Sequence, residues 1–172
     1  MQMTTKAVVA SDQEMIDRKE RPAVYLAAGL SLVAALIHLW AAPEHLEEWW
    51  AYGVFFLVAA LCQGFLSFLI VRWPESKTIS LAGIVCNLSI AAMYVVSRTW
   101  GMPLGPDWVP FSPYVAHLED PEVLGMFSTA AEVGIVFALV MLLDGAYRRA
   151  VINALLFLGV LIWALRLTGI LP

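Results

Sequence analysis

The sequence predicts an all-α integral membrane protein, folded as a single bundle of five transmembrane helices. Of its 172 residues, 61% are hydrophobic and only 14% are charged, and the charges fall in short clusters between apolar stretches. A soluble domain of this size has too little interior to bury so many apolar side chains. Five apolar stretches contain about 20 residues each, the length at which a helix crosses a ~30 Å hydrocarbon core.

The predicted spans are Pro22–Ala42, Trp49–Val71, Ile79–Ser97, Val123–Leu143 and Val151–Leu171. Residues 1–21 are polar and are expected to form a cytoplasmic tail, and residues 22–172 form one transmembrane domain. A cleaved signal peptide is the alternative for the first span. We expect this span to be retained, because Trp40 stands where a cleavage site needs a small residue and several acids precede the apolar stretch.

The positions of Lys and Arg predict that the N-terminus lies inside and the C-terminus outside, because loops rich in these residues stay cytoplasmic. Arg72 and Lys77 lie between the second and third spans, and Arg148 and Arg149 lie between the fourth and fifth. The loops on the other side carry mostly acids. The expected location is a bacterial cytoplasmic membrane, with the lipid bilayer as partner and no nucleic acid.

Two outer helix starts can be predicted from local signals. Pro43, followed by Glu44, Glu47 and Glu48, combines a proline suited to a first helical position with carboxylates suited to the positive end of the dipole. The second helix is therefore expected to begin at Pro43, ahead of its apolar span. Asp120 is expected to cap the fourth helix in the same way.

The connection between the third and fourth helices is rich in both proline and aromatic residues. Prolines at this density prevent a continuous helix, while Trp, Phe and Tyr favour the headgroup layer of a bilayer. Residues 99–121 are therefore expected to form an ordered lid along the outer surface.

Glu132 is the most informative single residue, because it lies near the middle of the fourth span with no other ionisable side chain between Glu122 and Asp144. A charge at this depth costs roughly 3 kcal/mol or more, so the carboxyl group must be protonated, paired or in contact with water. Ion pairs with Arg98 or Arg166 are the structural alternatives to a functional role.

Small and polar residues form one stripe on each predicted helix, following spacings of three and four. The stripes are Ala27, Ser31, Ala34 and His38; Tyr52, Phe56, Ala59, Gln63 and Ser67; Gly83, Asn87, Ala91, Tyr94 and Arg98; Gly125, Ser128, Thr129 and Glu132; and Gly159 with Arg166. We expect these stripes to face one another, since small residues let transmembrane helices approach closely. The inner half of the bundle is almost purely apolar.

The polar residues predict a pocket that opens outward and closes near Gln63 and Asn87. Its expected ligand- or ion-binding residues are Glu132, His38, Arg98, Arg166, Asn87, Gln63 and Tyr94. Each has a structural alternative: Gln63 and Asn87 can simply bond one helix to another, and the two arginines can extend to the headgroups.

The sequence contains no motif for a metal, a haem or a catalytic centre. His45, Glu48 and His117 are weak metal candidates on the outer side, but there is no His-x-x-x-His, CxxC or paired Glu-x-x-His pattern. His38 is the only histidine within a span, which argues against ligation of a haem by two histidines. Cys62 and Cys86 lie inside spans and are expected to be inert thiols. An enzymatic role is therefore not favoured.

Two segments, EHLEEWWAYGVFFLVAALCQ and VSRTWGMPLGPDW, resemble those of a group of small, largely uncharacterised membrane proteins of actinobacteria and their relatives. The resemblance implies a polytopic membrane fold and no specific activity. Two functional hypotheses remain. The pocket around Glu132 binds a proton, a cation or a small polar ligand, or the protein is a non-catalytic accessory subunit of a respiratory or photosynthetic complex. The absence of an internal repeat favours a subunit or a homo-oligomer over a self-contained transporter.

Overall fold

The computed structural model describes residues 2–99 and 123–168, and for residues 2–21 it describes the backbone alone. The described residues form five helices, α1 (Gln2–Glu48), α2 (Trp50–Arg72), α3 (Lys77–Thr99), α4 (Val123–Leu142) and α5 (Gly145–Leu167), and no strand. All five helices are long and apolar enough to cross a membrane, which confirms the predicted all-α membrane class. The predicted lid and the weak metal candidate His117 lie outside the described residues, apart from Thr99 at the end of α3.

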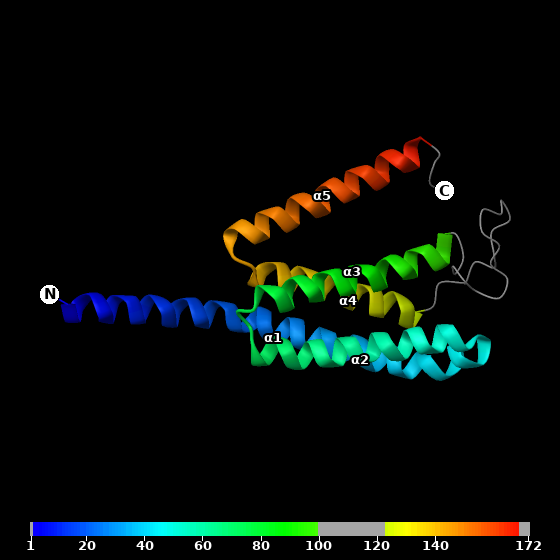
Figure 1. The fold of residues 1–172 in the computed structure, drawn as a ribbon, viewed down its shortest axis with the longest axis horizontal. Helices are drawn as coiled ribbons and strands as arrows, with labels where there is room; N and C mark the ends of the chain where they lie inside the picture. The colour runs from blue at the N-terminus through cyan, green and yellow to red at the C-terminus, as the bar shows by residue number, and fades with distance from the viewer. Residues whose placement is uncertain (1, 100–122, 169–172) are drawn as a thin grey trace.

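Helices α1 to α4 pack together, whereas α5 leaves the end of α4 and diverges from the other four (Figure 1). The segment expected to be a polar tail continues α1 as helix and extends beyond the bundle at the N-terminus (Figure 1). We call the end of the bundle that contains Trp49, the last turn of α3 and the first turn of α4 the Trp49 end. The opposite end contains the α2–α3 and α4–α5 turns and is called the Lys77 end.

The expected start of the second helix at Pro43 is wrong. Helix α1 continues through Pro43 to Glu48, the chain reverses at Trp49 in an extended conformation, and α2 begins at Trp50. A side chain at Gly53 would meet Leu46 Cγ at 2.0 Å, so glycine is what allows the two helices to approach this closely. This packing outweighs the local proline signal, and it leaves Glu44 and Glu48 at the helix end where the dipole disfavours them.

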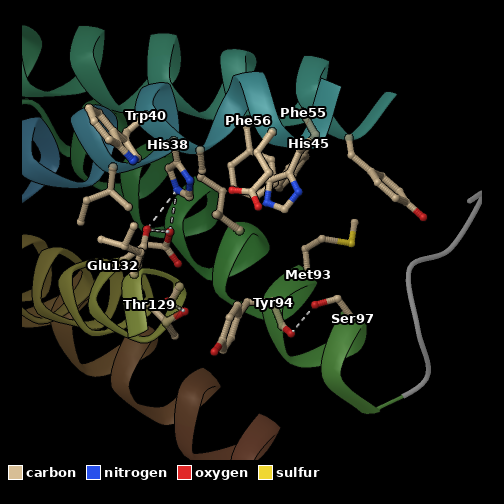
Figure 2. Close-up of a pocket in the computed structure, with 18 of the residues that line it drawn as sticks. His38, Trp40, His45, Phe55, Phe56, Met93, Tyr94, Ser97, Thr129 and Glu132 are labelled. Carbon is tan, nitrogen blue, oxygen red and sulfur yellow. Dashed lines mark hydrogen bonds and ion pairs between the residues drawn. The ribbon is translucent and has the colours of Figure 1, made fainter. Parts of the chain in front are cut away.

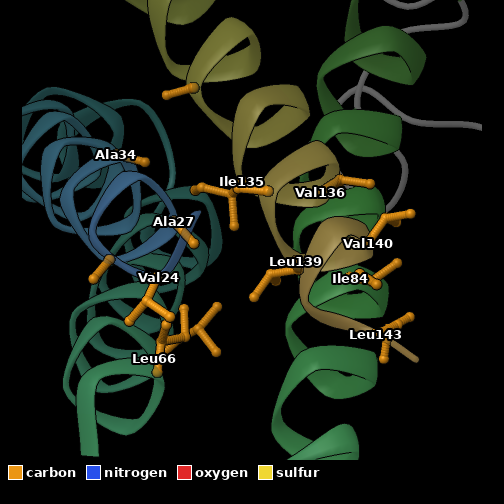
Figure 3. Packing of buried hydrophobic residues seen from close by; sticks show 14 residues of the cluster. Val24, Ala27, Ala34, Leu66, Ile84, Ile135, Val136, Leu139, Val140 and Leu143 are labelled. Carbon is orange, nitrogen blue, oxygen red and sulfur yellow. The ribbon is translucent and has the colours of Figure 1, made fainter. Parts of the chain in front are cut away.

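The core lies between α4 and the helices on either side of it. Ile135 of α4 points toward α1, Val136 and Val140 lie on the side of α3 (Figure 3), and Leu139 packs against Gly83 of α3. Ala27 and Ala34 of α1 are fully buried, so α1 presents a flat face to these larger side chains. Close packing of this kind is the main source of helix association in lipid, where the hydrophobic effect between helices is absent.

Two further glycines set the helix separations. A Cβ atom at Gly83 of α3 would lie 2.7 Å from Leu139 Cδ1, and one at Gly134 of α4 would lie 2.8 Å from Leu30 Cδ1. Contacts shorter than 3 Å would force the helices or these leucines apart. Gly83 belongs to a predicted stripe and acts as expected, as do the buried Ala27 and Ala34 of α1, whereas Gly134 was not on the stripe predicted for α4.

Helix α5 does not follow the prediction that every stripe faces the others. None of its described residues is buried, Gly159 has no atom of another element within 4 Å, and Arg166 is exposed. Only Val151 and Leu155, near its start, pack against the core. The reason is geometric: the short turn at Asp144 directs α5 away from α4, so the face that carries Gly159 and Arg166 meets no neighbour among the described residues.

Candidate functional site

The centre of the candidate site is a contact between His38 of α1 and Glu132 of α4. His38 Nε2 lies 3.0 Å from Glu132 Oε1, and the two residues are only 5% and 1% exposed. Figure 2 shows the two side chains pointing toward each other from separate helices. The expectation that Glu132 faces the bundle and contacts a polar side chain is confirmed, and the partner is a histidine rather than either arginine.

Ser128 completes this polar centre. Its hydroxyl group donates a hydrogen bond of 3.2 Å to Glu132 Oε1 and lies 3.3 Å from His38 Nε2. Because Ser128 precedes Glu132 by four residues, the helix places both on one face. Glu132 Oε1 is thus well satisfied.

The other polar atoms of the pair are not satisfied. Among the described residues, neither Glu132 Oε2 nor His38 Nδ1 has a hydrogen-bond partner, although both atoms are buried. Buried polar atoms without partners are uncommon and costly in proteins. Their position beside a cavity indicates that the missing partner is a proton, a water molecule or a ligand.

The cavity lies at the Trp49 end and has a volume of about 100 Å³. Side chains from α1 to α4 surround it, including His38, Trp40, Glu44, His45, Tyr52, Phe55, Phe56, Met93, Tyr94, Ser97, Arg98, Thr129 and Glu132 (Figure 2). This volume accommodates about three water molecules at ~30 Å³ each. Helix α5 contributes no lining residue, so Arg166 does not belong to the site.

Phe56 joins the inner and outer parts of the pocket. Its ring stacks on His45, with 4.1 Å between centroids, and meets the edge of His38 at 5.5 Å (Figure 2). His45 Nδ1 also lies 3.0 Å from Glu48 Oε2. The two histidines are seven residues apart on α1 and therefore share a face, which gives the pocket one His–Glu pair at its floor and one at its mouth.

Tyr94 and Arg98 form the α3 side of the pocket. The Arg98 guanidinium lies over the Tyr94 ring at 5.0 Å, and a Cβ atom at Gly125 would come within 2.7 Å of Tyr94 Cε2. Gly125 therefore makes room on α4 for the tyrosine ring. This is the reason the tyrosine can lie between α3 and α4.

Gln63 and Asn87 lie in the interior and do not line the cavity. Gln63 Nε2 donates to Asn87 Oδ1 at 3.1 Å, Asn87 Nδ2 donates to Gly83 O at 2.8 Å, and Ser31 Oγ donates to Gln63 O at 2.7 Å. All three side chains are completely buried. These hydrogen bonds connect α1, α2 and α3. Gln63 and Asn87 therefore bond one helix to another, which is the structural alternative that the sequence left open for them.

The described residues contain no group of three or more His, Cys, Asp or Glu side chains that is suited to a metal ion. His45 and Glu48 contact each other, but they lack a third ligand within the described residues. What the site offers instead is a buried acid–base pair in a small, largely aromatic cavity. Such a pair can hold or release a proton and can neutralise a bound charge.

Sequence reasoning identified His38, Glu132, Tyr94 and Arg98 as members of the pocket, and the structure brings these four together. It placed Ser128 and Phe56 on the stripes without assigning them to the site. For Ser128 the spacing of four residues from Glu132 was the available signal, whereas Phe56 lies on a different helix from the two histidines and had no such signal. Trp40, which the sequence analysis used only to argue against a cleavage site, also borders the cavity.

Comparison with known proteins adds no assignment, since no protein-family model, no curated protein and no solved structure matches the chain.

Proposed function

We propose that the protein is a membrane-embedded binding protein whose pocket opens to the outer side and takes up a proton, a cation or a small polar ligand at Glu132. The observation that carries this proposal is Glu132 Oε2, a buried carboxylate oxygen beside a cavity with no hydrogen-bond partner among the described residues. The outward direction follows from the excess of Lys and Arg in the loops at the Lys77 end.

Energetics favour function over stability as the role of the His38–Glu132 pair. Desolvating two ionisable groups costs several kcal/mol each, and apolar side chains of similar volume commonly stabilise a fold as well or better. The surrounding core already packs Ala34 and Ile135 with no exposure to solvent. A protein that needed only helix association here would gain more from another apolar contact.

An accessory-subunit role is the second candidate, and the exposed surface of α5 favours it. In the most apolar part of α5 none of the residues is buried, compared with 28 to 44% in the corresponding parts of the other four spans. A helix with so few contacts inside its own chain can pack against a partner subunit or a second copy. Native mass measurement of the protein extracted in a mild detergent, with identification of any co-purifying chain, tests this role.

The binding role is tested by comparing the wild type with Glu132→Gln, which keeps the size of the side chain and removes its charge. Melting temperatures in detergent are measured across pH and with added cations. We expect the wild type to respond to added cations and Glu132→Gln not to respond, because a ligand that binds only the folded state raises its stability. The pH dependence of Glu132→Gln should be weaker than that of the wild type by the contribution of Glu132, and the other ionisable groups, which are unchanged, keep the rest.

Glu75→Gln is the matched control, since Glu75 is an exposed carboxylate in the α2–α3 turn. This control should respond to pH and cations as the wild type does. Identical responses in the wild type and Glu132→Gln would exclude Glu132 as the binding group and leave the subunit role as the better explanation.

A further inference from the structure

We propose that the ligand of this pocket is a small organic cation, an alkylammonium ion, held by Glu132 and by the aromatic rings around the cavity. This inference rests on the proposed binding function and specifies its ligand class. It combines three independent features of the site: its rings, its charge and its size.

Aromatic residues form a large part of the cavity wall. Tyr52, Phe55, Phe56 and Tyr94 line it, together with His38 and His45, and the largely exposed Trp40 lies at its border. The face of an aromatic ring attracts a cation within about 6 Å of its centroid, and cages of such rings recognise alkylated ammonium groups. Arg98 over Tyr94, at 5.0 Å, shows that a ring of this pocket already takes part in such a contact.

The charge at the floor of the cavity also suits a cation. Glu132 presents Oε2 with no partner among the described residues, while Oε1 is held by Ser128 and His38. An N–H group of an ammonium ion would supply the missing donor, and its alkyl groups would contact the rings. An inorganic metal ion is less suited, because no set of three ligating side chains is found in the described ranges.

The size of the cavity limits the ligand. Its volume is about 100 Å³, whereas an apolar cavity of about 150 Å³ is known to hold benzene. A ligand of roughly four or five non-hydrogen atoms is therefore the expected scale. Trimethylammonium and tetramethylammonium fall within this range, and methylammonium is a smaller probe of the same class.

Binding of a cation at Glu132 should compete with binding of a proton at the His38–Glu132 pair. A second positive charge beside Glu132 would disfavour the protonated form of His38, so affinity for the cation should rise with pH. The other titratable or charged groups that line the pocket are Glu44 and His45 on α1, Tyr52 on α2, and Tyr94 and Arg98 on α3. The variant Glu132→Gln assigns the effect to the His38–Glu132 pair, because it leaves these other groups unchanged.

The test uses the full chain in lipid nanodiscs and measures binding by calorimetry and by melting temperature. The probes are the chloride salts of methylammonium, trimethylammonium and tetramethylammonium, with sodium and potassium chloride as controls for ionic strength. Tert-butanol is the uncharged control of similar size. We expect at least one ammonium probe to bind, with an affinity that rises with pH, and the three controls not to bind.

Variants separate the contributions of charge and rings. Glu132→Gln should weaken the binding of the ammonium probe at least tenfold, and Phe56→Leu should weaken it about three- to thirtyfold through loss of the cation–π contact. Tyr94→Leu provides a second ring variant if Phe56→Leu fails to fold. Phe65→Leu is the matched control, because the Phe65 ring is 62% exposed on the outside of α2, and it should bind as the wild type does.

The outcomes distinguish this inference from the proposed function. If no ammonium probe binds but Glu132→Gln still weakens the pH response, the inference is overturned and the proton-binding function stands. Equal binding of a probe by the wild type and Glu132→Gln also overturns it. Loss of binding in both Glu132→Gln and the ring variants, with Phe65→Leu unaffected, supports it.

Discussion

Helices α4 and α5 have nearly the same mean hydropathy, 2.0 and 2.2. In the most apolar part of each helix, however, 44% of the residues of α4 are buried and none of the residues of α5. Helix α4 places Gly134 against α1 and its buried face against α3, whereas Gly159 of α5 meets none of the other described elements. Hydropathy therefore determines that both helices can cross a membrane. Which of them becomes the centre of the bundle depends on whether small and polar residues meet a complementary face.

The largest expected difference between the two helices concerns their ionisable residues. His38→Ala removes the partner of Glu132 on α4 and should destabilise the fold by about 3–5 kcal/mol at neutral pH, because it leaves a buried carboxylate unpaired. Arg166→Ala on α5 should change stability by less than about 0.5 kcal/mol, because its side chain is exposed. Unfolding by denaturing detergent measures both.

Part of the destabilisation caused by His38→Ala should disappear in the double variant His38→Ala, Glu132→Gln, since no unpaired charge is then buried. Equal stabilities for His38→Ala and Arg166→Ala would mean that Glu132 carries no charge in the fold, or that the pair does not form.

Apolar truncation should give the next largest difference. Leu139→Ala removes a fully buried side chain of α4 and should cost about 2–4 kcal/mol, because the cavity left behind loses packing contacts. Leu156→Ala is the matched change on α5, where the leucine is 63% exposed, and it should cost little. The same unfolding assay compares them. A large loss with Leu156→Ala would indicate that α5 packs against a partner subunit or a second copy.

The interior hydrogen bonds should have a smaller effect. Gln63→Leu breaks the bond to Asn87 and should destabilise the protein by roughly 0.6–2 kcal/mol, the usual range for such bonds between transmembrane helices. Ser89→Ala is the control, since the exposed Ser89 hydroxyl bonds only the carbonyl of Val85 in its own helix. Binding of a proton or ligand at Glu132 should be unchanged in both variants, because neither residue lines the cavity. Loss of binding in Gln63→Leu would show that the site extends deeper than the cavity.

The smallest effect is expected at the turn that starts α5. Asp144 caps α5 through Ala146 N and Tyr147 N and forms an ion pair with Lys77. The hydrogen bond from Lys77 is the main reason that the pKa of Asp144 is lowered below its ordinary value. The folded pKa is thus below the unfolded one, so this contribution is present above the ordinary pKa of about 3.9 and is lost as pH falls through the folded value.

Asp144→Asn should therefore lower the melting temperature slightly at pH 6, and the difference from the wild type should shrink as the pH is lowered toward 3. Thermal unfolding at these pH values measures it. A difference that grows on acidification would contradict the assigned direction.

The polar residues show how much of the site can be predicted from the sequence alone. Glu132 and His38 could be assigned to a shared pocket because helical spacing places each on a stripe of small residues, and because a buried charge needs a partner. The choice of His38 over Arg98 or Arg166 as that partner could not be predicted, since it depends on the depth and rotation of α1 against α4. Phe56 could not be assigned either, because its contacts with two histidines exist only after the hairpin at Trp49 has closed.

The sequence by itself determined the class of this protein, the approximate extent of its five apolar helices and the stripe on which Glu132 lies, because composition and helical periodicity are local properties. Tertiary structure alone decided that α1 continues past Pro43 to Glu48, that α5 diverges from the bundle and that Gln63 bonds Asn87 outside the cavity. These features depend on close contacts between helices, such as Leu46 against Gly53 and Leu139 against Gly83. Contacts of this kind join residues that helical spacing within a single segment cannot relate to one another.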